Sequence, residues 1–166
     1  MRNLTTILTL TILFLSITKG SLMAKEPNKV APGKTVQIHY TLTVDGREVD
    51  SSNGGEPLVY EQGKGNIIPG LEHQLEGMSV GEKKHVIIGP DDAYGPVNPN
   101  AFVNVPVEKL PPEARQPGAV VTAPGEQGQT MRAMVVDVKD NQATLNFNHP
   151  LAGKELAFDV EVVDVN

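Results

Sequence analysis

The feature that most constrains the fold is a ten-residue run, residues 35–44, in which apolar and polar side chains alternate before Asp45-Gly46. Alternation with a period of two predicts a β-strand with one face in the core, and Asp-Gly is a strong signal for a two-residue hairpin turn. The apolar face carries Tyr40. His39 falls on the other face, where we expect a solvated strand residue with no catalytic role.

A change of hydrophobic period predicts a short helix within residues 67–77. Pro69 suits the first helical turn, because an N–H at that position would have no helical partner. Leu71 belongs to an apolar repeat at helical spacing, and Gly77 offers a C-terminal stop. Strand character returns over residues 80–88. We therefore expect antiparallel strands with one amphipathic helix packed on them.

Composition excludes several classes of function. Thirteen prolines and sixteen glycines, against four Phe, three Tyr and no Trp, favour short strands and many turns over a helical bundle. The formal charge of −6, with no run of Lys or Arg, makes nucleic acid an unexpected partner. The absence of Cys removes disulfides, thiol nucleophiles and thiolate zinc sites. The four histidines lack metal-ligand spacing, so we expect neither a metal nor another cofactor.

The first 24 residues differ from the rest of the chain. Arg2 precedes an apolar and Thr-rich run, residues 4–17, which is followed by small residues and then by the polar residues 25–29. That order is typical of a secretory signal peptide. We expect export to the periplasm or the cell exterior with cleavage of residues 1–24; an uncleaved membrane anchor is the alternative.

The segment 98–147 has a pattern of its own. A Pro-rich opening and one possible helical turn at residues 112–115 precede strand-like runs separated by turn signals. The pattern predicts an antiparallel meander. Its three expected strands are residues 119–123, 130–138 and 142–147.

Motifs in a fixed order along the chain carry a family resemblance. They are Ile38-His39-Tyr40, Asp45-Gly46, Val49-Asp50-Ser51-Ser52, Pro57-Leu58, Gly63-Lys64-Gly65-Asn66-Ile67-Ile68-Pro69-Gly70-Leu71-Glu72, Leu75-Glu76-Gly77-Met78, Val80-Gly81-Glu82, Ala93-Tyr94-Gly95 and Asn148-His149-Pro150-Leu151-Ala152-Gly153. This set resembles the FKBP-type peptidyl-prolyl cis-trans isomerases. The last motif, with the strand-like residues 154–160 that follow it, is similar to the return segment of the SlyD-like subgroup.

The resemblance implies a fold and a domain organisation. The expected class is α+β: an FKBP-like antiparallel sheet wrapped on a short helix, with a small all-β insert domain in the flap loop. The isomerase domain would be discontinuous, comprising residues 30–97 and 148–166. Residues 98–147 would form the insert-in-flap domain, which the resemblance connects with binding of unfolded chains.

The resemblance also implies a site. Tyr40, Asp50, Ile68 and Tyr94 would be the catalytic residues: the backbone amide of Ile68 and the hydroxyl of Tyr94 would hold substrate carbonyl groups, and Asp50 would orient Tyr40. The residues that would bind the prolyl ring, beside Tyr40 and Ile68, are Val49, Leu58, Ile67, Leu71 and Phe158.

The residues by themselves leave alternatives open. Tyr40 could be an ordinary core tyrosine, and Asp50 could simply close a turn through hydrogen bonds to the backbone. Val49, Leu58 and Leu71 stand where single-domain family members carry aromatic residues, which predicts a more aliphatic pocket. The His- and Cys-rich tail with which many SlyD-like proteins bind nickel has no counterpart in this sequence, so no metal role is expected.

Two hypotheses of different class follow. The first is an exported, monomeric prolyl isomerase that assists folding, with unfolded or proline-containing polypeptides as partners. The second is a non-catalytic holdase that binds the same segments. A hydrolase is a weaker third idea, because the sequence shows no nucleophile paired with a base.

Overall fold

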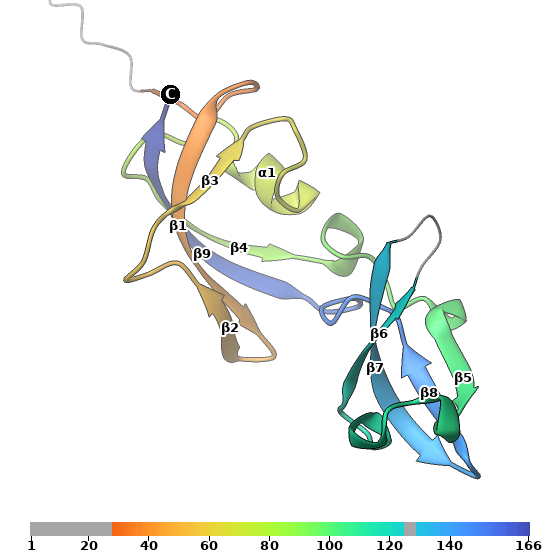
Figure 1. The fold of residues 1–166 in the computed structure, drawn as a ribbon. Coiled ribbons are helices and arrows are strands. Elements are labelled where there is room, and N and C mark those ends of the chain that lie inside the picture. Colours follow the sequence, from red (N-terminus) through yellow and green to blue (C-terminus); the bar gives the residue numbers. More distant parts are fainter. Residues whose placement is uncertain (1–27, 125–128) are drawn as a thin grey trace, which may run out of the picture.

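The computed structural model describes residues 28–124 and 129–166, so the predicted leader, residues 1–24, lies outside the described part of the chain. Two antiparallel sheets account for all the strands described, and one α-helix packs on the first sheet (Figure 1). None of the helices in these residues has the length and apolar character needed to cross a lipid bilayer.

The first sheet is built around β1 (Thr35–Val44). It also contains β2 (Arg47–Ser51), β3 (Leu58–Glu61), β4 (Lys83–Ile88) and β9 (Leu156–Val165), in the order β2-β1-β9-β4 with β3 also paired to β1. Strand β9 takes one edge of β1, while β3 and β2 share the other edge in succession. The predicted alternation of β1 is confirmed, since Val36, Ile38, Leu42 and Val44 are buried.

The helix α1 (Pro69–Leu75) begins and ends where the sequence predicts. Pro69 occupies its first turn, and Gly77 follows its end at a φ of 81°, a left-handed conformation that glycine adopts without strain. Leu71 and Leu75 are buried in the same cluster as the inward-facing residues of the sheet. Burial of this apolar face holds the helix on the sheet.

The second sheet has its own buried cluster. Its strands are β5 (Phe102–Pro106), β6 (Val120–Pro124), β7 (Thr130–Lys139) and β8 (Gln142–Asn146), in the order β5-β8-β7-β6. The cluster consists of Leu110, Ala114, Val121, Ala133, Val135, Ala143 and Leu145. Short 3-10 turns lie at Pro90–Asp92, Pro99–Ala101, Val107–Lys109 and Pro112–Ala114.

Strand β5 corrects the sequence interpretation, which expected only three strands after a Pro-rich opening. It is an edge strand whose one partner among the described strands is β8, and its side chains are exposed or half-buried throughout. Because neither face of such a strand is fully buried, its side chains need not alternate between apolar and polar. Pro106 has no backbone N–H to donate, but an edge strand tolerates proline because one side of its backbone has no strand partner. The pattern used to find the other strands was therefore absent here.

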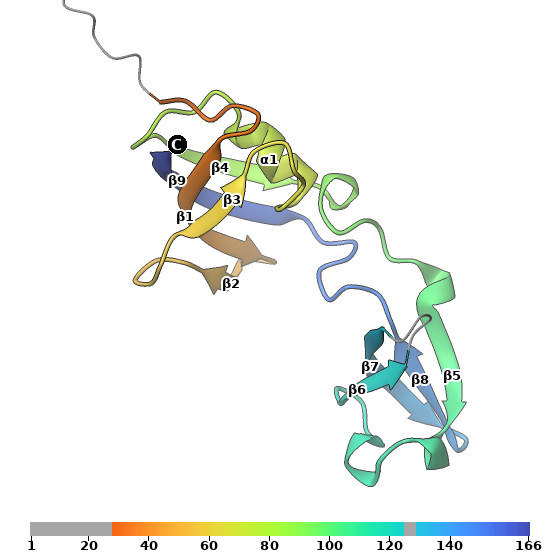
Figure 2. The ribbon, with the colours of Figure 1, turned by 45° about the horizontal axis from the view of Figure 1, so that its top comes forward.

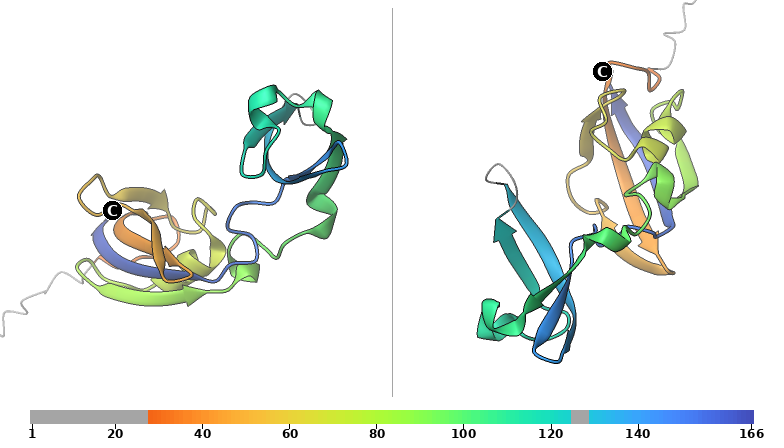
Figure 3. Two further views of the ribbon diagram at one scale, coloured as in Figure 1. Left: turned by 90° about the horizontal axis from the view of Figure 1, so that it is seen from below. Right: turned by 90° about the vertical axis from the view of Figure 1, so that its right-hand side faces the viewer.

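Two chain segments run between the sheets (Figures 2 and 3). They are tied together by Asn148, whose Oδ1 accepts from the Asn98 N–H at 2.8 Å and whose Nδ2 donates to the Asn98 carbonyl at 3.1 Å. The Gly153 N–H donates to the Gly95 carbonyl at 2.8 Å. Asn146 supports this pair, because its Oδ1 accepts from both the backbone and the side-chain amide of Asn148.

Candidate functional site

An apolar cavity of about 210 Å³ involves the first sheet, helix α1 and the loop around Tyr94. It brings together all but one of the residues proposed for the site. Its lining consists of Tyr40, Leu42, Asp50, Leu58, Asn66, Ile67, Ile68, Leu71, Tyr94 and Phe158. Leu42 and Asn66 are the two that sequence reasoning missed, although the strand period had already placed Leu42 on the face of Tyr40.

Val49 is the predicted residue that does not line the cavity. The pairing of β1 with β2 passes from Leu42↔Asp50 to Thr43↔Glu48, which leaves Val49 as the extra residue of a β-bulge. Its side chain is 51% exposed. At this bulge Asp50 lines the cavity, whereas its neighbour Val49 does not.

Tyr40 and Asp50 form the main polar pair of the cavity. The Tyr40 hydroxyl donates to Asp50 Oδ2 at 2.5 Å, and Asp50 Oδ1 accepts from the Ser51 N–H at 2.9 Å. The hydrogen bond to Asp50, reinforced by burial and by the negative charge of Asp50, raises the pKa of Tyr40 to about 12. Tyr40 is therefore a neutral phenol at physiological pH, with its ring tilted by 52° against that of Phe158 at 6.1 Å between centroids.

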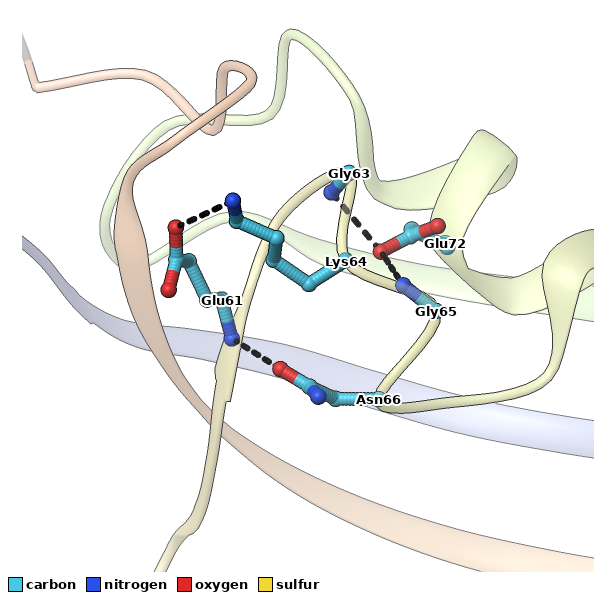
Figure 4. A network of polar contacts seen from close by, with 6 residues as sticks. All are labelled: Glu61, Gly63, Lys64, Gly65, Asn66 and Glu72. Carbon is cyan, nitrogen blue, oxygen red and sulfur yellow. Dashed lines mark hydrogen bonds and ion pairs between the residues drawn. The ribbon is translucent and has the colours of Figure 1, made fainter.

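A polar network holds the loop that precedes the helix (Figure 4). Glu72 Oε1 accepts from the N–H groups of Gly63 at 2.8 Å and Gly65 at 3.4 Å, and the Glu61 N–H donates to Asn66 Oδ1 at 3.1 Å. Sequence reasoning named Glu72 only as part of a motif and missed this clamp. The clamp fixes the path of the chain into Ile67 and Ile68.

Ile68 caps α1 without using its own N–H. Its carbonyl accepts from the N–H groups of Leu71 and Glu72, at 3.1 Å each, whereas its N–H donates to no acceptor within residues 28–124 and 129–166. A free backbone donor beside an apolar cavity can bind a carbonyl oxygen of a ligand.

Tyr94 reaches the cavity from the loop after β4. Gly95 follows it at a φ of 76°, and the N–H groups of Ala93 and Gly95 both donate to the Pro90 carbonyl, at 3.1 and 2.7 Å. Its hydroxyl has no hydrogen-bond partner in the described part of the chain. Its ring is stacked on that of His149, with 3.8 Å between centroids and 8° between planes. Sequence reasoning placed no role on His149.

The other face of the sheet carries a different cavity, of about 300 Å³. His39, Lys83 and His85 are among its lining residues, and His85 Nδ1 lies 2.7 Å from Asp159 Oδ1. The predicted outward face of His39 is confirmed. Among the described residues, no group of three or more His, Cys, Asp or Glu side chains is arranged to hold a metal.

Comparison with known proteins agrees with the geometry. The family model for FKBP-type peptidyl-prolyl cis-trans isomerases matches residues 26–163. The FKBP-type isomerase SlyD of Aeromonas hydrophila is 38% identical over 138 residues, which cover 82% of this chain and 65% of that protein. A probable FKBP-type 16 kDa isomerase of Pseudomonas fluorescens is 33% identical, with 82% and 92% covered. A short-type isomerase of Methanocaldococcus jannaschii is 34% identical over 154 residues, with 83% and 95% covered.

This chain therefore spans a little under two thirds of the Aeromonas protein and nearly all of the other two. The matched residues include all of both sheets except the last two residues of β9, and every residue that lines the apolar cavity. The chain belongs to the FKBP-type peptidyl-prolyl cis-trans isomerases, the enzyme family that its motifs indicated.

Proposed function

We propose that this protein isomerises X-Pro bonds of unfolded or partly folded polypeptides in the cavity that Tyr40, Ile68 and Tyr94 line. The observation that carries the proposal is the composition of this cavity: aliphatic and aromatic walls, one carboxylate held by a phenol, and a free backbone N–H at Ile68. Such a site binds an apolar ring and two carbonyl groups.

The chemistry requires no nucleophile. Amide resonance sets a barrier of about 18–20 kcal/mol to rotation about the peptide bond. The planar amide is more dipolar than the twisted one, so transfer from water to an apolar cavity favours the twisted state relative to the planar state. The Ile68 N–H and the Tyr94 hydroxyl would hold the flanking carbonyl groups, and Asp50 would fix the Tyr40 ring as one wall.

The cavity favours a prolyl ring over a larger ligand. Leu58 and Leu71 line it where aromatic side chains would make a deeper and more rigid wall, and Val49 lies outside it. We therefore expect weak affinity for drug-like macrocycles. The substrate is held through one small ring and its neighbouring peptide groups.

We further propose that the second sheet is the insert-in-flap domain and binds unfolded chains. One row across the sheet joins Val120, Met134, Asn146 and Phe102 through consecutive strand pairs. Residues opposite one another in paired strands share a face, and the three apolar members are 61%, 41% and 39% exposed. An apolar strip containing Met suits an adaptable surface for varied segments.

The place of action is proposed from residues 1–24, whose pattern is that of a secretory signal. We propose that the mature protein works as a monomer in the periplasm or outside the cell, or at the membrane if the leader is retained. N-terminal sequencing of the protein isolated from its host tests this, since a start at Met1 would exclude cleavage.

The proposal is tested with two substrates and one deletion. Residues 99–147 are replaced by a short Gly-Ser linker, which the hydrogen bonds between Asn98 and Asn148 show to be sterically feasible. The variant should keep its activity in a protease-free assay on a short Ala-Leu-Pro-Phe peptide but lose most of its effect on a protein whose refolding is limited by a prolyl bond. Equal loss on both substrates would contradict a separate binding role for the second sheet.

The competing candidate is a non-catalytic holdase, which the exposed strip on the second sheet would also support. If the full chain suppresses aggregation but leaves both isomerisation rates at their uncatalysed values, the holdase replaces the isomerase. A catalysed rate on the peptide excludes this candidate, because a short peptide offers no segment for the strip.

A further inference from the structure

We infer that His149 is a positioning residue for Tyr94: its imidazole is the stacking platform that holds the phenol at the mouth of the apolar cavity. The inference rests on the proposed function, because it assigns a partner to one of the residues that would bind substrate. His149 lies 55 residues after Tyr94 in the sequence, beyond the whole second sheet.

The contact between the two rings is direct. The centroids are 3.8 Å apart and the planes are nearly parallel, at 8°, so the imidazole covers one face of the phenol. Tyr94 has little else to fix it: its side chain is 41% exposed, and its hydroxyl has no partner among the described residues. A tyrosine on an exposed loop samples several rotamers unless packing selects one.

His149 is itself held. The Leu151 N–H donates to its Nδ1 at 3.2 Å. On its N-terminal side, Asn148 is tied to both backbone groups of Asn98. The platform is therefore anchored to the two segments that cross between the sheets.

The same imidazole also lines a second cavity, of about 620 Å³, together with Val120, Met134 and Asn146 of the apolar strip. His149 is thus a wall shared by the second sheet and the loop of Tyr94. At this location the exposed ring joins the proposed client surface to the proposed catalytic pocket.

Two substitutions test whether His149 positions Tyr94 through the ring stack or only stabilises its own turn by accepting from the Leu151 N–H. His149→Asn keeps an acceptor for the Leu151 N–H but removes the stacked ring, whereas His149→Phe keeps a ring and removes the acceptor. If His149 positions Tyr94, kcat/KM on the short proline peptide should fall roughly fivefold in His149→Asn, the effect of about 1 kcal/mol for an aromatic pair, and stay within twofold in His149→Phe. The opposite order would overturn the inference.

A double-substitution cycle tests whether His149 acts through Tyr94. In a Tyr94→Ala background, His149→Asn should cause no further loss of kcat/KM, because the ring to be positioned is gone. An equal loss in both backgrounds would overturn the inference. The ring-proton shifts of Tyr94 in NMR spectra provide a second measurement: they should move in His149→Asn, and unchanged shifts would show that no stack exists in solution.

His85→Ala is the matched control, since His85 is an exposed histidine on the opposite face of the sheet and should leave peptide turnover unchanged. The rate of the wild-type protein distinguishes failure of the proposed function from failure of the role proposed for His149. A wild-type rate equal to the uncatalysed rate refutes the proposed function; a catalysed wild-type rate that His149→Asn leaves unchanged refutes only the role of His149.

Discussion

Replacing Asp50 with Ala should lower kcat/KM on a short proline peptide about tenfold. The substitution removes the acceptor that lies 2.5 Å from the Tyr40 hydroxyl and the cap on the Ser51 N–H. Hydrogen bonds to charged groups contribute about 1.5–3 kcal/mol, and we take the lower end because Asp50 is exposed and water can replace it. A loss of about 1.4 kcal/mol in transition-state stabilisation corresponds to a factor of ten.

The assay is the protease-free conversion of cis to trans peptide, accompanied by a spectroscopic titration of tyrosine. Asp50→Asn should give an intermediate rate, because one amide oxygen replaces two carboxylate oxygens that accept from different donors. Glu48→Gln is the matched control, an exposed acid on the same strand that does not line the cavity. The reasoning is refuted if Asp50→Ala lowers the pKa of Tyr40 toward its ordinary value yet leaves kcat/KM unchanged.

Three further predictions concern the scaffold and the phenols. Gly70→Ala should reduce the free energy of unfolding, measured by denaturant titration, by about 1–3 kcal/mol, because the new Cβ would lie 2.5 Å from Ile88 Cγ2. Gly89→Ala is the control: its new Cβ would meet no atom within 4 Å, so the free energy of unfolding should change by less than about 0.5 kcal/mol. Equal midpoints for the two variants would contradict the packing argument. The pKa of Tyr40 is raised from 10 in the unfolded chain to about 12, so its contribution to stability is complete below pH 10 and is lost as pH rises toward 12. In Tyr40→Phe, the free energy of unfolding should therefore fall less steeply between pH 10 and 12. Denaturant titrations at several pH values measure this slope, and a slope equal to that of the wild type would disprove the link between Tyr40 ionisation and stability. Tyr94→Phe should lower kcat/KM by about two- to fivefold, since it removes the hydrogen bond that the hydroxyl would donate to a substrate carbonyl. The melting temperature should not change, because that hydroxyl has no partner among the described residues. A larger loss of kcat/KM would mean that the hydroxyl does more than hold a carbonyl.

The parts of the fold that were predictable are those in which local pattern and burial coincide. The alternation around Ile38 identifies β1 because one face of that strand is buried, and Pro69 and Gly77 mark the ends of α1 through backbone preferences that act locally. Strand β5 was not predicted, because the side chains of an exposed edge strand need not alternate between apolar and polar. Alternation of side chains therefore fails as a signal where burial does not enforce it.

The composition of the site could be anticipated better than its geometry. The family resemblance identified Phe158 as a wall of the cavity, although Phe158 lies far from Tyr40 in sequence. The structure explains their proximity, because Tyr40 lies in β1, Phe158 lies in β9, and these two strands pair. The bulge that displaces Val49 could not be anticipated, because it depends on how β2 registers against β1. The clamp from Glu72 to the loop N–H groups and the stack on His149 are likewise tertiary contacts without a local signal.

The position of the second sheet in the chain explains how the apolar cavity and the proposed client-binding strip can occur in one protein. Strands β4 and β9 pair directly, from Lys83↔Glu161 to Ile88↔Leu156, so the first sheet is closed without any help from the residues between them. The residues between Ile88 and Leu156 therefore do not interrupt this strand pairing, and some of them add contacts to the cavity. Because Tyr94 precedes the second sheet and His149 follows it, the stacked pair closes the base of the insertion at the site where substrate would enter.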